Sequence, residues 1–261
     1  MPELKNNGLK IKMFPCRSDN YGFLVHDPVS GQTASIDTPD PDVIMQEAQA
    51  AGWTLTHIFN THHHFDHVGG NKAIKDALGV TIIGPRAEAS KIPHIDIAVG
   101  EGDTAALGHH KAAVFDTPAH TLGHIAYHFA DDAVIFVGDT LFALGCGRLF
   151  EGTPAMMWAA MQKFAALPDA TQVYCAHEYT LSNAAFALSV DGANPALIDY
   201  VARAKALREK GLPTVPTTIG AEKAANPFMR ADTPALRKSV NMMEASAADV
   251  LGEIRRRKDA F

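Results

Sequence analysis

Four side chains that commonly bind divalent metals lie within six residues of one another, namely His62, His64, Asp66 and His67. Imidazole and carboxylate groups are the preferred ligands of borderline ions such as zinc. The apolar segment 55–60 precedes them and is expected to be a strand. Because a strand end projects alternate residues to one side, His62 and His64 can converge on one ion. Asp66 and His67 follow where the chain turns into a helix, and they can face a second ion.

Four ligands cannot complete two coordination spheres, so later residues must contribute. Three candidates each follow an apolar, strand-like segment: His120, Asp139 and His177. The ends of strands are where open α/β sheets gather their functional groups. We interpret the other histidines that stand out as structural, or as partners that orient a ligand: His57, His63, His94, His109, His110 and His124.

The cysteines carry no comparable signal. Cys146 and Cys175 lie near the candidate ligands in sequence, but neither has an obvious base beside it. A free Cys is commonly a small buried apolar residue, so we expect no cysteine nucleophile. Together with Cys16 they are too few and too scattered for a disulfide framework.

The elements that must position these residues change in type along the chain. Short apolar or β-branched segments predict strands in the first two-thirds, over residues 21–26, 34–36, 55–60, 80–83, 112–115, 125–129 and 133–137. Helices are interleaved with them: one begins at the Asp40-Pro41 cap and ends before Gly52, and two others cover 71–78 and 154–167.

Beyond residue 180 the strand signals almost vanish. Amphipathic patterns predict helices over 181–190, 194–210 and about 234–258, with Pro213, Pro216 and Gly220 breaking the run. We therefore predict two domains, an α/β domain over residues 1–180 and a mostly helical domain over residues 181–261.

Composition and charge exclude several classes of protein. The net charge of −6 argues against a nucleic-acid binder, which needs a broad basic surface. A local basic run over 255–258 could still serve a small anionic ligand. No stretch approaches the roughly 20 apolar residues of a membrane helix, and no secretory signal begins the chain. We expect a cytoplasmic, monomeric enzyme without a membrane partner.

The ordered set of ligands resembles the signature of the metallo-β-lactamase superfamily, a His-x-His-x-Asp-His loop followed by His, Asp and His. This resemblance implies an αββα sandwich of two sheets flanked by helices. It also implies that one metal is bound by His62, His64 and His120, and the other by Asp66, His67 and His177, with Asp139 bridging the two. We expect two divalent ions per chain, zinc first, with iron and manganese as alternatives.

Further segments narrow the resemblance to the glyoxalase II family, namely residues 61–71, 145–153, 177–180, 226–230 and 256–261. The similarity runs nearly end to end and includes the helical region. In that family the helical domain covers the active site and contributes glutathione contacts. Carried over, these contacts would be Arg148, Tyr179, Arg255 and Lys258. The chain departs from the family pattern at Phe150, where some members have Tyr, and at Arg257, where an acidic residue is common.

The resemblance implies hydrolysis of S-D-lactoylglutathione to D-lactate and glutathione, the second step of methylglyoxal detoxification. A water that bridges two divalent ions has a pKa lowered toward neutrality, so a hydroxide nucleophile is available without a strong protein base. Asp139 would hold the ions at bridging distance, and Asp66 could orient the nucleophile. The basic residues would position the glutathione moiety, whose two carboxylates suit Arg and Lys.

Two other hypotheses compete with this one. A glutathione-persulfide dioxygenase of the same superfamily, with one iron, would also use basic residues for glutathione. The helical C-terminal domain favours the hydrolase over it. A non-catalytic metal-binding relative is the third hypothesis, and the complete ligand set argues against it. A lactonase or β-lactamase explains none of the residues after position 180.

Overall fold

The computed structural model describes residues 8–261. The chain forms two compact units. The first unit comprises the chain up to Asp116 together with Gly123–Phe136, and the second comprises Thr117–Leu122 and Val137–Phe261. Among the described residues no helix is both long and apolar enough to cross a membrane.

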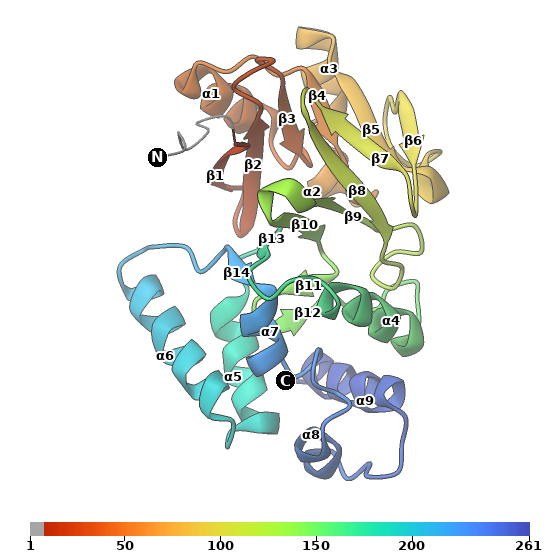
Figure 1. Ribbon diagram of the computed structural model, residues 1–261, viewed down its shortest axis with the longest axis vertical. Coiled ribbons are helices and arrows are strands. Elements are labelled where there is room, and N and C mark those ends of the chain that lie inside the picture. Colours follow the sequence, from red (N-terminus) through yellow and green to blue (C-terminus); the bar gives the residue numbers. More distant parts are fainter. Residues whose placement is uncertain (1–7) are drawn as a thin grey trace, which may run out of the picture. The chain divides into compact units, whose positions relative to one another are not determined.

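A six-stranded sheet forms the frame of the first unit (Figure 1). Its strands lie in sequence order: β1 (Lys10–Cys16), β2 (Asn20–His26), β3 (Thr33–Ile36), β4 (His57–Phe59), β5 (Thr81–Pro85) and β6 (Ile97–Val99). The first three are antiparallel, whereas β3 to β6 are parallel. Parallel neighbours place their carboxyl ends at the same edge of the sheet, and β3 and β4 therefore deliver their following loops to one place.

Helices connect the parallel strands: α1 (Pro41–Ala51), α2 (Phe65–Val68) and α3 (Asn71–Leu78). Asp40 caps α1 by accepting from the N–H groups of Asp42 and Val43, and Gly52 ends it at φ +70°. The predicted start and end of this helix are thus confirmed. A short 3₁₀ turn, η1 (Arg86–Glu88), follows β5.

One face of the first sheet packs against α1 and α3 (Figure 1). The core there includes Leu24, Ile44, Ile58, Ile74 and Ile82, all fully buried. Burying one such side chain contributes about 1.5–3 kcal/mol. The alternate residues of the strands point to the opposite face, where the Phe23 and Phe136 rings lie 5.5 Å apart. Phe136 belongs to the second sheet, so this face is the interior of a sandwich.

The second sheet has the order β14-β13-β10-β9-β8-β7. Its strands are β7 (Thr104–Leu107), β8 (His110–Asp116), β9 (Ile125–Phe129), β10 (Val134–Gly138), β13 (Gln172–Cys175) and β14 (Thr217–Thr218), and the 3₁₀ turn η2 (Ala130–Asp132) joins β9 to β10. Strands β7 to β10 are linked by antiparallel pairing.

The second unit contains a small hairpin, β11 (Leu141–Phe142) and β12 (Gly145–Cys146), and six helices. The helices are α4 (Pro154–Ala165), α5 (Thr180–Asp191), α6 (Pro195–Glu209), α7 (Ile219–Ala225), α8 (Pro234–Ser239) and α9 (Ala247–Asp259). Leu144 of the hairpin packs with Leu197 and Tyr200 of α6 in a buried cluster. The hairpin is therefore part of the core of this unit.

All seven predicted strands are present, but two predictions for the helical region are wrong. The stretch 234–258 is two helices, because Asn241 adopts φ +60° after α8 and Ser246 caps a new helix. Gly220 lies inside α7 and does not break it. A Cβ at that position would lie 3.0 Å from the Cβ of Asp169, which explains a Gly in a helix. The predicted domain boundary near residue 180 stays a prediction.

Candidate metal centre

Four of the predicted ligands gather at the end of β4 in the first unit. His62 is fully buried in the loop after the strand, and its Nε2 lies 3.0 Å from His64 Nδ1. Asp66 and His67 lie within α2, where His67 Nε2 is 3.5 Å from Asp66 Oδ2. These short distances place two pairs of side chains side by side in the loop after β4 and in α2.

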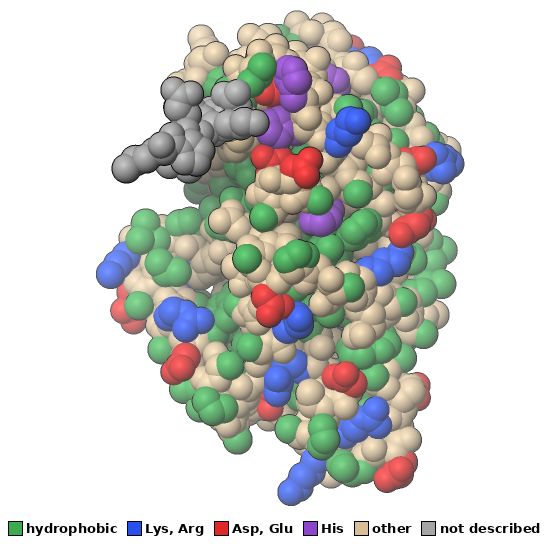
Figure 2. Space-filling model, viewed as in Figure 1, with side chains coloured by type: hydrophobic (Ala, Val, Ile, Leu, Met, Phe, Trp, Pro, Cys, Tyr) green, Lys and Arg blue, Asp and Glu red, His purple; other side chains and the backbone are tan. Residues whose placement is uncertain are grey.

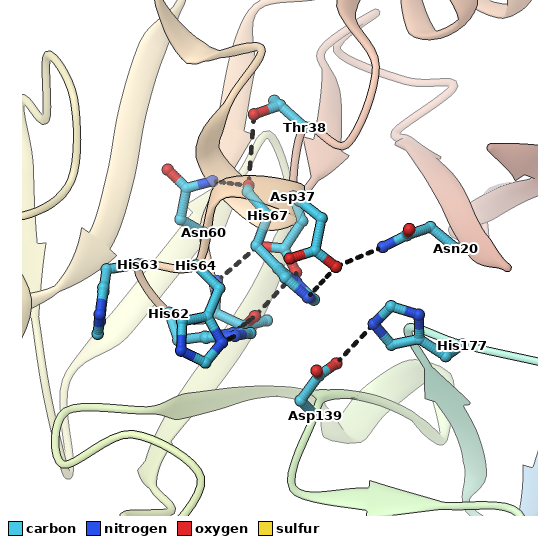
Figure 3. A network of polar contacts seen from close by, with 12 residues as sticks. Asn20, Asp37, Thr38, Asn60, His62, His63, His64, His67, Asp139 and His177 are labelled. Atoms are coloured by element: carbon cyan, nitrogen blue, oxygen red, sulfur yellow. Dashed lines mark hydrogen bonds and ion pairs between the residues drawn. The ribbon is translucent and has the colours of Figure 1, made fainter. Parts of the chain in front are cut away.

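Asp37 organises this group of predicted ligands, although it was not among the predicted site residues. Its carboxylate is buried and accepts three hydrogen bonds, from Thr61 N, Thr61 Oγ1 and His67 Nδ1, each at 2.8 Å (Figure 3). A His that donates from Nδ1 carries its lone pair on Nε2, which is the atom a metal binds. The signal was present, because Asp37 directly follows β3, the parallel neighbour of β4.

Amide side chains hold the rest of the loop in place. Asn20 Nδ2 donates to Asp66 Oδ2 at 3.0 Å and so fixes one oxygen of that carboxylate. Asn60 Nδ2 donates to the His67 carbonyl at 2.9 Å, and Thr38 Oγ1 donates to the same carbonyl at 3.3 Å (Figure 3). Buried polar networks of this kind restrict side chains to one arrangement.

The other three predicted ligands come together in the second unit. His120 Nε2 lies 3.4 Å from Asp139 Oδ2, and His177 Nε2 lies 3.4 Å from Asp139 Oδ1. His120 Nδ1 donates to the Arg148 carbonyl at 2.9 Å, which leaves the lone pair of this ring on Nε2. All three side chains are buried.

The donor chemistry fits metal cations. The lone pair of His120 Nε2 faces a carboxylate oxygen of Asp139, and that of His67 Nε2 faces one of Asp66. Two electron pairs that face each other favour a cation between them. Three groups of donors could each hold an ion: His62, His64 and His120; His62, His67 and Asp139; and Asp66, His67 and His177. The chain therefore carries metal-binding clusters of His and Asp.

The basic and aromatic side chains predicted to hold the substrate differ in accessibility. Arg148 has 67% of its side chain exposed, and its Nε lies 3.9 Å from Asp259 Oδ1. The Tyr179 ring stacks on the predicted ligand His177, with centroids 4.7 Å apart and planes at 2°. Lys258 lies over the Phe186 ring, and burial together with the charge of Arg255 lowers its pKa to about 8.

Arg255 is buried, with 5% of the residue exposed. Its Nη1 donates to the Cys146 carbonyl at 2.9 Å and its Nη2 to Asp259 Oδ1 at 2.8 Å. The guanidinium also lies over the Phe228 ring. Arg255 therefore fastens α9 to the β12 strand, besides placing a positive charge near Lys258.

Three other histidines, His63, His110 and His124, have partners that suit a structural role. His63 Nδ1 lies 2.9 Å from Glu88 Oε2, and His110 Nδ1 lies 2.7 Å from Asp132 Oδ2. The His124 ring stacks on that of the predicted ligand His62, with centroids 4.7 Å apart. Burial raises the pKa of Cys146 to about 11 and that of Cys175 to about 12, so neither thiol is a thiolate near neutral pH.

Comparisons with known proteins agree with this geometry. Residues 22–177 match the metallo-beta-lactamase superfamily, and residues 178–261 match the family described as hydroxyacylglutathione hydrolase C-terminus. A hydroxyacylglutathione hydrolase of Maricaulis maris is 59% identical over 97% of this chain and 99% of its own length. One from Rhizobium johnstonii is 53% identical over the same shares.

Solved structures support the fold alone. The crystal structure of ETHE1 from Myxococcus xanthus is 23% identical, with a TM-score of 0.66 over 96% of this chain and 99% of that one. The BLEG-1 B3 metallo-beta-lactamase is 21% identical, with a TM-score of 0.66 over 84% and 99%. The predicted αββα sandwich with a C-terminal helical domain is confirmed.

Proposed function

We propose that the chain, which belongs to the hydroxyacylglutathione hydrolase family of the metallo-beta-lactamase superfamily, acts on S-D-lactoylglutathione through a centre of two metal ions. It has that family's thioester hydrolase activity. The observation that carries the proposal is the complete donor set. Imidazole and carboxylate groups from seven residues form the clusters described above.

We assign His62, His64 and His120 to one ion, and Asp66, His67 and His177 to the other, with Asp139 as the bridging carboxylate. Two of these groups of three are among the donor clusters. Asp139 suits a bridge because each of its two oxygens faces the Nε2 of a different histidine. Zinc is the proposed ion, with iron and manganese as alternatives, since imidazole and carboxylate ligands suit all three.

When bound, two divalent ions lower the pKa of a shared water toward neutrality and polarise a carbonyl group. The protein's own residues do the positioning. Asn20 fixes Oδ2 of Asp66, so the other carboxylate oxygen can accept a hydrogen bond from the attacking water. Asp37 fixes the tautomer of His67. A thiolate is a good leaving group, and no general acid is assigned.

The glutathione moiety is proposed to contact Arg148, Tyr179 and Lys258. The buried Arg255 would add positive charge beside Lys258. Arg148 is exposed, and Tyr179 is in direct contact with the ligand His177. Arg and Lys both suit the carboxylates of glutathione, Arg by a planar pair of donors and Lys as a point charge. Positioning of this kind lowers the entropic part of the barrier.

The test is the loss of the thioester absorbance of S-D-lactoylglutathione, measured with zinc-loaded protein with and without a chelator. Rapid hydrolysis that the chelator abolishes is expected. Folded protein that holds two metals but leaves the thioester intact would refute the substrate, and oxygen consumption with glutathione persulfide would then replace it. Folded protein that holds no metal would favour a binding role.

We also propose that the enzyme is cytoplasmic and monomeric. The three cysteines are free and buried, as is usual in a reducing compartment. On the face drawn in Figure 2, Lys and Arg side chains are interspersed with Asp and Glu. This mixture supports a small-molecule substrate rather than a nucleic acid. Sedimentation of the purified protein tests the monomer.

A further inference from the structure

One hairpin of the second unit lies between the proposed ligand Asp139 and Arg148, whose carbonyl orients a second proposed ligand, His120. The β11–β12 hairpin follows Asp139 and precedes Arg148. Gly147 N donates to Thr140 O at 3.2 Å and closes the base of the hairpin. The Arg148 carbonyl accepts from His120 Nδ1. The placement of this hairpin therefore sets the placement of both Asp139 and His120.

So short a hairpin cannot hold its own position, since isolated two-stranded hairpins are marginally stable. Its tip is buried, and its backbone groups need partners. Glu222 Oε2 accepts from Leu144 N at 2.9 Å. This bond secures the least favourable residue of the tip, because Leu144 has φ +59°, in the left-handed region that disfavours residues with a side chain.

Two amides hold the neighbouring carbonyls. Asn226 Nδ2 donates to Gly145 O at 2.9 Å and to Phe142 O at 3.2 Å. Asn183 Nδ2 donates to Ala143 O at 3.0 Å. The approach is close, since a Cβ at position 145 would lie 2.5 Å from the Asn183 amide nitrogen. Only a Gly fits there without displacing the amide.

The three side chains are themselves fixed by the helical region. Glu222 and Asn226 are fully buried and joined by a 2.9 Å hydrogen bond. The other carboxylate oxygen, Glu222 Oε1, accepts from Thr217 Oγ1 at 2.7 Å and from Tyr200 OH at 3.0 Å. These hydrogen bonds tie the tip to Asn183 of α5, to Glu222 of α7 and to Asn226 at the end of α7, while Tyr200 of α6 holds Glu222 in turn.

We propose that Asn183, Glu222 and Asn226 are positioning residues for the metal centre. By clamping the hairpin tip they fix Asp139 at one end of the hairpin and, through the Arg148 carbonyl, His120 at the other. Groups that orient ligands matter because small displacements of a donor weaken metal binding. This inference rests on the proposed function, in which Asp139 and His120 are ligands.

The test compares Asn183→Ala and Glu222→Ala with a matched control, Asp27→Ala. Asp27 is also a fully buried carboxylate, and it accepts from His109 N at 2.9 Å between β7 and β8, where no proposed ligand lies. Three quantities are measured: zinc retained against a graded chelator, kcat and KM with S-D-lactoylglutathione, and the Tm of the metal-free protein.

The two clamp variants are expected to lose roughly tenfold in zinc affinity and in kcat, the range typical of groups that orient metal ligands. Asp27→Ala is expected to lower Tm while zinc affinity and kcat stay at the wild-type values. The proposal is overturned if the clamp variants lower Tm as the control does but retain zinc and kcat.

If Glu222→Ala does not fold, Asn183→Ala decides, because it removes a single hydrogen bond to the hairpin. Failure of the proposed substrate is a separate result. Wild-type protein that binds zinc but leaves the thioester intact refutes the reaction, and the zinc affinities of the variants still decide whether the clamp positions the ligands.

Discussion

Asp37 lies outside the proposed ligand set but can control one of its members, His67. Its carboxylate accepts three hydrogen bonds, and an amide of the same shape offers only one oxygen. We expect Asp37→Asn to lower zinc affinity and kcat by about 10–100-fold, because the His67 ring loses its fixed tautomer. Zinc competition with a chelator measures the effect.

The control for Asp37 is its neighbour Asp40, which caps α1 and contacts no ligand. Asp40→Ala should lower the free energy of unfolding by about 1 kcal/mol, as loss of an N-cap usually does. Zinc affinity should remain at the wild-type value. Equal zinc affinities in Asp37→Asn and wild type would contradict the assigned role.

Lys258 predicts a pH dependence of substrate binding. Its pKa is lowered to about 8, first by burial and then by the charge of Arg255. The lysine is therefore charged below this pH and loses its charge as pH rises through about 8, so a carboxylate of glutathione is held less well. We expect KM to rise across this interval in wild type and to stay flat in Lys258→Met. Coincident profiles would exclude the contact.

At the scale of elements, the bounds of the helices could be predicted from residues at or next to their ends. The Asp40 cap, the first-turn prolines and the terminal Gly residues act within a few residues, so the predicted bounds of α1 and α3 hold. Six strands were not predicted, namely β1, β6, β7, β11, β12 and β14; the last three have two residues each, too few to show a pattern. The break between α8 and α9 was missed because Asn241 is not a Gly.

The packing of α9 on α4 predicts whether an Ala at position 252 raises or lowers the free energy of unfolding. Gly252 lies within α9, where Ala would ordinarily stabilise a helix by about 1 kcal/mol. Here a Cβ would lie 2.8 Å from Cγ of Pro154, in a ring that cannot turn aside. We expect Gly252→Ala to lower the free energy of unfolding by about 1 kcal/mol, since overpacking outweighs helix propensity.

Urea unfolding measures this change in free energy, with Arg256→Ala, an exposed position on the same helix, as the control. A higher free energy of unfolding for Gly252→Ala would contradict the prediction, because it would mean that α4 and α9 can move apart enough to accommodate the added methyl group.

At the scale of the whole molecule, the ligand set predicts that metal removal lowers stability. Metal that binds the folded state alone adds about 2.7 kcal/mol at a free concentration 100 times its Kd, which raises Tm by about 5–10 °C in a protein of this size. Scanning calorimetry of zinc-loaded and chelated protein measures the shift. Identical Tm values would mean that the donors hold no ion.

The proposed metal ligands were easier to predict from the sequence than the residues that position them. All seven proposed ligands occur in short motifs of recognisable type. Asp37, Asn20 and the hairpin clamp lack any such motif, because an Asp or Asn becomes informative only beside its partner. Asn226 donates to residues more than eighty positions earlier in the chain, a separation that no local pattern reports.

The interleaving of the two units has a consequence for biosynthesis. The chain contributes Thr117–Leu122 to the second unit and then returns to complete the first with Gly123–Phe136. A ribosome therefore delivers His120 early, 28 residues before the carbonyl of Arg148 that orients it, and long before Glu222. The first unit can fold on the nascent chain before the Arg148 carbonyl that orients His120 has been synthesised. The proposed ligand set is complete only once His177 has been synthesised, so chains terminated before that residue should bind zinc less tightly than the full chain.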